Sequence, residues 1–158
     1  MAVSSTPKSA TNPLIIGYGS PIRQDDGMGW RAAELLRQAL PPETATVIED
    51  HQLTPELVTS LKEAALVIFL DAAADLNPGT IRLQALRPAK VEPWSHHILP
   101  DQLLALAEQI NGNAPRAFLI TGGVQDMGLS ETLTATGERC AAGMADLARR
   151  LILTEPRV

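Results

Sequence analysis

The chain of 158 residues is the size of one domain, and with 45% hydrophobic and 20% charged residues it can bury a core. Its net charge of −5, from 13 basic and 18 acidic residues, argues against a nucleic-acid groove or a basic membrane-surface protein, and 3% aromatic residues leave little for base stacking. The single cysteine excludes an intrachain disulfide, no apolar run reaches the ~20 residues of a membrane helix, and residues 1–12 lack the apolar core of a secretory signal, so we expect a cytoplasmic protein.

The first 70 residues alternate apolar runs with segments that carry an apolar stripe at helical spacing. The run over 66–70 is apolar at every position, which is typical of a central strand covered by helices on both faces. Thr54 and Pro55 suit the N-cap and first position of a helix, and Pro41-Pro42 ends the helix before it. We predict strands over 13–18, 44–49 and 66–70, and helices over 27–40 and 54–62.

The second half of the chain continues this alternation, with one exception. Residues 80–86 alternate apolar and polar positions, which predicts a half-exposed strand near a sheet edge. We interpret Cys140 as a core residue on a helical stripe rather than as a nucleophile. We predict a further strand over 117–121 and helices over 100–110 and 131–153, with stripes at Leu103, Leu104, Ala107 and Ile110 and at Cys140, Met144, Leu147 and Leu151.

The order of these elements predicts an α/β fold. Strands that alternate with helices give a three-layer αβα sandwich around a mainly parallel, twisted sheet of about five strands, with one antiparallel strand. No linker or internal repeat divides the chain. We therefore expect a single domain over residues 13–158, preceded by a disordered arm over residues 1–12.

In open α/β sheets, ligands bind outside the carboxyl ends of the strands, and this rule selects the candidate site. The residues there are Gly17 to Asp26, His51-Gln52, Asp71 and the segment 122–130. A dinucleotide site is disfavoured, because the third glycine of that fingerprint is replaced by Ile22 and adjacent carboxylates repel pyrophosphate.

The acidic residues and histidines near these strand ends have structural as well as functional interpretations. Asp25 and Asp26 stand before a predicted helix and fit N-capping, although one cap does not need two carboxylates. Asp71 ends an apolar strand, where a carboxylate is costly to bury unless it is paired, hydrogen-bonded or coordinating. Tandem histidines point in different directions, so at most one of His96 and His97 enters a given site. Two carboxylates and one imidazole would suit nickel, zinc, manganese or iron with open positions.

The segment 17–29, G-Y-G-S-P-I-R-Q-D-D-G-M-G, resembles the opening pattern of the nickel–iron hydrogenase maturation proteases, G-x-G-N-x-x-x-x-D-D/E-G-x-G. The likeness continues through the loop 51–57, Leu70-Asp71-Ala72, and Ser95-His96 before a helix, and it extends from about residue 14 to 152. The chain departs from the pattern at Ser20, where the family usually has Asn.

The resemblance implies an αβα endopeptidase that removes a short C-terminal extension from a hydrogenase large-subunit precursor after nickel insertion. It implies that Asp26, Asp71 and His96 bind nickel supplied by the substrate, which is consistent with a protein that is metal-free at rest. Our hypothesis for the chemistry has two forms: the metal polarises the scissile carbonyl, or Asp26 or Asp71 is the base that activates water. His96 is chosen over His97 because Ser95 precedes it. The substrate contacts implied are Gly19, Ser20, Asp25, Gln52, Thr54 and His97.

Two other functions use the same residues. A stand-alone metallohydrolase would turn over small amides or esters with a permanently bound metal, and a non-catalytic nickel- or nucleotide-binding module would cleave nothing. The expected partner is the large-subunit precursor, with no nucleic acid or membrane, and we expect a monomer.

Overall fold

A computed structural model describes residues 12–90 and 97–155 of the chain. The predicted arm over 1–12 lies almost wholly outside these ranges. In chain order, the first four secondary-structure elements are β1 (Leu14–Tyr18), a short 3-10 helix η1 (Gln24–Gly27), α1 (Met28–Ala39) and β2 (Thr46–Asp50). They are followed by α2 (Leu57–Lys62), β3 (Leu66–Ala73), β4 (Ile81–Leu86), α3 (Pro100–Asn111), β5 (Arg116–Gly123) and α4 (Ala135–Thr154).

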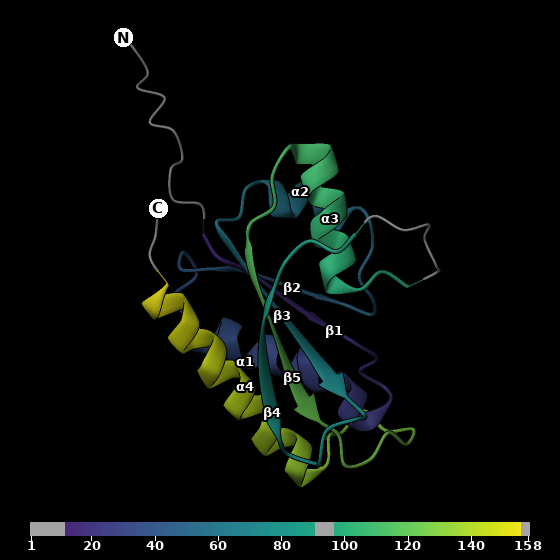
Figure 1. The fold of residues 1–158 in the computed structure, drawn as a ribbon. Coiled ribbons are helices and arrows are strands. Elements are labelled where there is room, and N and C mark those ends of the chain that lie inside the picture. The colour runs from purple at the N-terminus through teal and green to yellow at the C-terminus, as the bar shows by residue number, and fades with distance from the viewer. Residues whose placement is uncertain (1–11, 91–96, 156–158) are drawn as a thin grey trace.

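The described strands form one five-stranded sheet in the order β2-β1-β3-β5-β4. The β1–β2, β1–β3 and β3–β5 pairs are parallel, and the edge strand β4 runs antiparallel to β5. Helices α1 and α4 cover one face and helices α2 and α3 the other (Figure 1). This confirms the predicted three-layer sandwich and its antiparallel edge strand; the single-domain assignment over 13–158 stays a prediction.

Alternation along the central strand explains why it is apolar throughout. In β3, Ile68 and Leu70 pack under α1 and α4, whereas Val67 and Phe69 pack under α2 and α3, and all four are fully buried. Successive side chains point to opposite faces of a strand, so a strand between two helical layers has no polar face.

Some helix boundaries and stripes differ from the predictions. Helix α2 begins at Leu57 rather than Thr54, and Thr54 Oγ1 donates to the Glu56 carboxylate instead of capping the helix. Helix α4 begins after Thr134, whose hydroxyl accepts a hydrogen bond from the Gly137 N–H. Ile110, in the last turn of α3, is 65% exposed and so does not belong to the buried stripe predicted for that helix.

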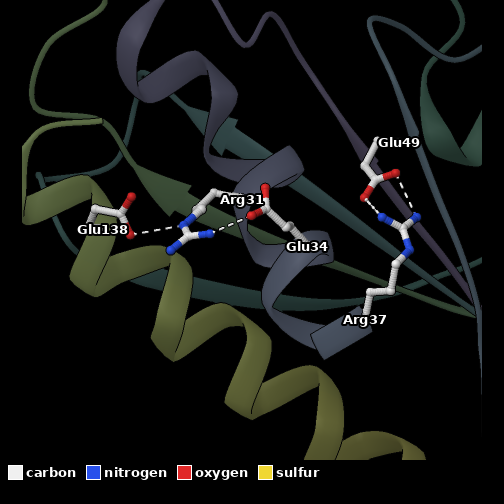
Figure 2. Close-up of polar contacts among 5 residues, drawn as sticks. All are labelled: Arg31, Glu34, Arg37, Glu49 and Glu138. Carbon is white, nitrogen blue, oxygen red and sulfur yellow. Dashed lines mark hydrogen bonds and ion pairs between the residues drawn. The ribbon is translucent and has the colours of Figure 1, made fainter. Parts of the chain in front are cut away.

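Ion pairs fasten α1 to its neighbours (Figure 2). The Arg31 guanidinium donates to Glu34 in the same helix and to Glu138 at the start of α4, 3.1 Å away. The Arg37 guanidinium donates to both carboxylate oxygens of Glu49 in β2. These contacts hold α1 against α4 and β2, and thus fix the helix that begins at the candidate site.

No described helix is long and apolar enough to cross a bilayer.

Candidate functional site

The candidate site lies where the sheet changes direction. From β1 the chain crosses through α1 to β2 on one side, whereas β3, on the other side of β1, leads on to β4 and β5 (Figure 1). The crevice at the carboxyl ends of β1 and β3 is the switch point at which doubly wound sheets bind their ligands. The predicted site residues on the first and third strands therefore meet at one place.

Asp26 is held in the loop after β1 by a local turn. The Ser20 N–H donates to Asp26 Oδ2 at 2.9 Å. Gly19 has a φ of +136°, and a Cβ at this position would clash with the Asp26 carbonyl oxygen. Glycine is therefore required at Gly19, because the backbone conformation and the close approach of Asp26 both exclude a side chain. Through this turn, Gly19 and Ser20 position the Asp26 carboxylate.

The start of α1 is pressed directly onto the ends of the two strands. A Cβ at Gly29 would clash with the Leu70 carbonyl oxygen and lie 2.8 Å from that of Tyr18. Only glycine permits this approach. Gly29, the last glycine of the opening motif, therefore allows the segment that carries Asp26 to lie close to Asp71.

Asp71 in β3 is a partly buried carboxylate that accepts hydrogen bonds from two neighbouring groups. Its Oδ1 accepts a hydrogen bond from the Ala72 N–H at 2.8 Å, and its carboxylate accepts another from the Tyr18 hydroxyl. Burial, with a smaller contribution from the negative charge of Asp26, raises the pKa of Asp71 to about 6, against the hydrogen bonds from Ala72 and Tyr18, which lower it. Burial and the neighbouring Asp71 charge also raise the pKa of the Tyr18 hydroxyl, which stays protonated and donates.

Asp25 faces away from this crevice and has a structural environment. It is fully buried, and it accepts hydrogen bonds from the N–H groups of Gln125, Asp126 and Thr134 and from the Thr134 hydroxyl. Burial alone would raise the pKa of Asp25, but the hydrogen bonds from Gln125, Thr134 and Asp126 outweigh it and lower the pKa. Asp25 thus ties η1 to the loop after β5 and to the start of α4, and its predicted contact with substrate stays a prediction.

Neither aspartate caps α1, so the N-capping interpretation is wrong. The N-cap of α1 is Gly27, which has no side chain to donate or accept. Asp25 and Asp26 belong to the 3-10 turn η1 that precedes α1, and this turn leaves Asp25 inside the protein and Asp26 half-buried toward the crevice.

The other predicted residues lie in separate loops. Gln52 is exposed after β2, Thr54 is half-buried in the next turn, and His97 is exposed before α3. His96 and Ser95 lie outside the described residues, so the structure does not choose between the two histidines. Cys140 is 3% exposed in α4, which confirms its interpretation as a core residue, and burial raises the pKa of its thiol.

The described part of the crevice brings two carboxylates together but holds no complete set of metal ligands. Within the ranges 12–90 and 97–155, no three His, Cys, Asp or Glu side chains are grouped so as to hold a metal ion. Asp26 and Asp71 supply two carboxylates whose charges repel each other. Carboxylate oxygens with one imidazole are a donor set that nickel accepts, and such a set leaves coordination positions for a substrate.

Three polar residues in line with Asp71 were not among the site residues predicted from the sequence. Tyr18 in β1 and Thr121 in β5 are on the strands that flank β3, and Arg82 in β4 is paired with Thr121. The sequence signal for them is weak: Tyr18 and Thr121 are polar residues near the ends of apolar strands, whereas Arg82 is near the start of a half-exposed strand. Their alignment with Asp71 follows from strand order and register, which the sequence pattern does not specify.

A comparison with known proteins finds one curated relative along most of the chain. No model of a protein family matches. The hydrogenase expression/formation protein HupM of Azotobacter chroococcum is 31% identical over 163 residues, which cover 94% of this chain and 78% of that protein.

Solved structures share the fold. The NiFe hydrogenase maturation protease HycI from Thermococcus kodakarensis has a TM-score of 0.72 at 19% identity, covering 92% of this chain and 94% of that one. The hydrogenase maturating endopeptidase HybD from E. coli has a TM-score of 0.68 at 21% identity, covering 89% and 91%. At these identities the structural likeness bears on the fold alone, whereas the similarity to HupM extends along the sequence.

Proposed function

This chain belongs to the nickel–iron hydrogenase maturation proteases, and on that premise we propose that it is the endopeptidase that removes a C-terminal extension from a hydrogenase large-subunit precursor. Cleavage follows the insertion of nickel, so the enzyme must recognise the metal state of its substrate. Nickel is then part of the substrate rather than a resident cofactor.

One observation carries this proposal: Asp26 and Asp71, which are 45 residues apart in the chain, approach each other at the switch crevice closely enough for their charges to repel. Two neighbouring carboxylates destabilise each other unless they share a cation or a proton. The nickel of a loaded precursor would supply that cation. His96 is our proposed third ligand, and the adjacent His97 is the alternative.

The same carboxylates can serve the hydrolysis. Water adds to the carbonyl carbon of the scissile bond, the C–N bond breaks, and the proton from water ends on the released amine. Either Asp26 or Asp71 would act as the base that takes the proton from water, or the nickel of the substrate would polarise the scissile carbonyl. Asp26, Asp71 and the histidine would together hold the metal-bearing segment of the precursor. The assignment to an aspartic type of peptidase is part of this proposal.

The decisive test is the mass of the precursor. We expect the nickel-loaded precursor to lose a short C-terminal peptide when it is mixed with this protein, and the nickel-free precursor to keep its full mass. If the loaded precursor stays full length while another protease of the class shortens it, this protein does not process that partner. Turnover of small amides or esters by protein with a permanently bound metal would instead favour a stand-alone metallohydrolase. We place the reaction in the cytoplasm and expect a monomeric enzyme, both as proposals from the sequence.

A further inference from the structure

Side chains from four strands lie in one row across the carboxyl edge of the sheet, on the face covered by α2 and α3. Asp71 in β3 is paired with Thr121 in β5, and Thr121 is paired with Arg82 in β4. Tyr18 of β1 completes the row through its hydrogen bond to Asp71. Paired residues on neighbouring strands point to the same face, so Thr121 and Arg82 extend the site beyond Asp71.

Two buried polar atoms in this row have no partner among the residues that the structure describes. Thr121 is 4% exposed, and its hydroxyl oxygen makes no hydrogen bond there. Arg82 pairs with Asp75 through Nη1 at 3.2 Å, which leaves its buried Nε–H without an acceptor. A buried polar group without a partner destabilises the folded state, so two such groups on directly paired residues point to a ligand that both of them bind.

The chemistry of the two groups specifies that ligand. The Arg82 Nε–H can only donate, and the Thr121 hydroxyl can donate as well, so a shared ligand must be an acceptor oxygen. The nearby carboxylates of Asp71 and Asp75 disfavour an anion, so the pair suits a neutral acceptor such as a carbonyl oxygen. A peptide chain whose scissile bond lies at Asp71 carries such oxygens on either side of that bond.

We propose that Thr121 and Arg82 form a donor pair that binds a main-chain carbonyl oxygen of the precursor next to the scissile bond. This inference rests on the proposed function, and it adds substrate-binding residues on β5 and β4 to the carboxylates on β1 and β3.

The test compares variants that keep or remove each donor, with kcat/KM for processing of the nickel-loaded precursor and thermal unfolding as the two measurements. Thr121→Val keeps the shape of the side chain and removes the hydroxyl. We expect its kcat/KM to fall about tenfold or more while its Tm is unchanged or raised, because the variant no longer buries an unpaired polar group. Thr121→Ser, which restores a hydroxyl, should recover most of the loss.

Arg82→Lys tests the second donor, since it keeps the positive charge and loses the Nε–H. Its kcat/KM should also fall about tenfold. Asp75→Asn is the matched control, because it removes only the exposed ion pair at Nη1 and should process at the wild-type rate. Wild-type kcat/KM in Thr121→Val and Arg82→Lys would overturn the inference, and so would a clear loss of Tm in Thr121→Val, which would reveal a structural partner for the hydroxyl. If the wild-type protein itself does not shorten the precursor, the proposed function is refuted, and so is the proposal that Thr121 and Arg82 bind a carbonyl oxygen of that precursor.

Discussion

The Tyr18 hydroxyl donates a hydrogen bond to the Asp71 carboxylate across the neighbouring strands β1 and β3. This bond joins the first motif of the chain to the aspartate that ends its central apolar run. It favours the ionised form of Asp71, whereas burial and the charge of Asp26 oppose that form. The charge of Asp71 therefore destabilises the folded state relative to the unfolded state.

Replacing Asp71 should separate stability from activity. In Asp71→Asn the amide oxygen can still accept from Ala72 and Tyr18, and no charge is buried. We expect the variant to lose processing activity and yet to unfold at a higher temperature than the wild type at pH 8. Thermal unfolding and the precursor mass assay measure the two effects, and a lower Tm in the variant would show that the Asp71 charge stabilises the fold.

The same residue predicts how the stability of the substrate-free protein depends on pH. The pKa of Asp71 is raised from 3.8 to about 6, so between these values the folded state binds a proton that the unfolded state has released. The contribution of Asp71 to the free energy of unfolding therefore falls by up to about 3 kcal/mol as the pH rises from 4 to 6. Above pH 6 this contribution is constant. Denaturant titrations of the wild type and Asp71→Asn at pH 4.5 and pH 8 isolate this contribution, which should vanish in the variant.

Removing the Tyr18 hydroxyl should affect Asp71 in a defined direction. Tyr18→Phe keeps the ring and loses the donor that lowers the pKa of Asp71. We expect the pKa of Asp71 to rise above its wild-type value, as followed by the carboxyl carbon resonance in an NMR titration, and processing at pH 7 to slow. An unchanged resonance would mean that the hydroxyl does not act on Asp71.

The adjacent aspartates of the opening motif should respond in opposite ways. Asp25→Asn places an amide against four hydrogen-bond donors and should destabilise the fold by about 2–3 kcal/mol. Because the folded pKa of Asp25 is lowered, its stabilising contribution is present above about pH 4 and is lost as the pH falls through the folded pKa. Asp26→Asn should leave the free energy of unfolding within about 0.5 kcal/mol and abolish processing. Equal losses of stability in the two variants would contradict this division.

The tandem histidines are separated by a pair of substitutions. We expect His96→Ala to abolish processing of the nickel-loaded precursor, because the metal loses its imidazole ligand, and His97→Ala to retain more activity. The precursor mass assay decides which histidine is the ligand, provided that thermal unfolding shows the same Tm for both variants. The reverse result would assign the ligand to His97.

Much of the fold was predictable because its signals are local. The apolar run over 66–70 indicated a central strand, and the alternation over 80–86 indicated an edge strand. A strand that is buried on both faces is apolar at every position, whereas a strand with one exposed face alternates apolar and polar residues. Two details at helix ends were predicted less well: α2 begins at Leu57 rather than Thr54, and Ile110 does not belong to the buried stripe of α3, because the local pattern does not specify what packs against the ends of a helix.

The site divides in the same way. By itself, the sequence determined the strand ends on which acidic residues stand and, through the G-x-G and D-D-G-x-G motifs, the family of the chain. Tertiary structure alone decided that Asp25 turns inward while Asp26 faces the crevice, and that Tyr18, Asp71, Thr121 and Arg82 share a row. The physical reason is that strand order and register pair residues that are tens of positions apart, and no local preference of the chain encodes such pairing.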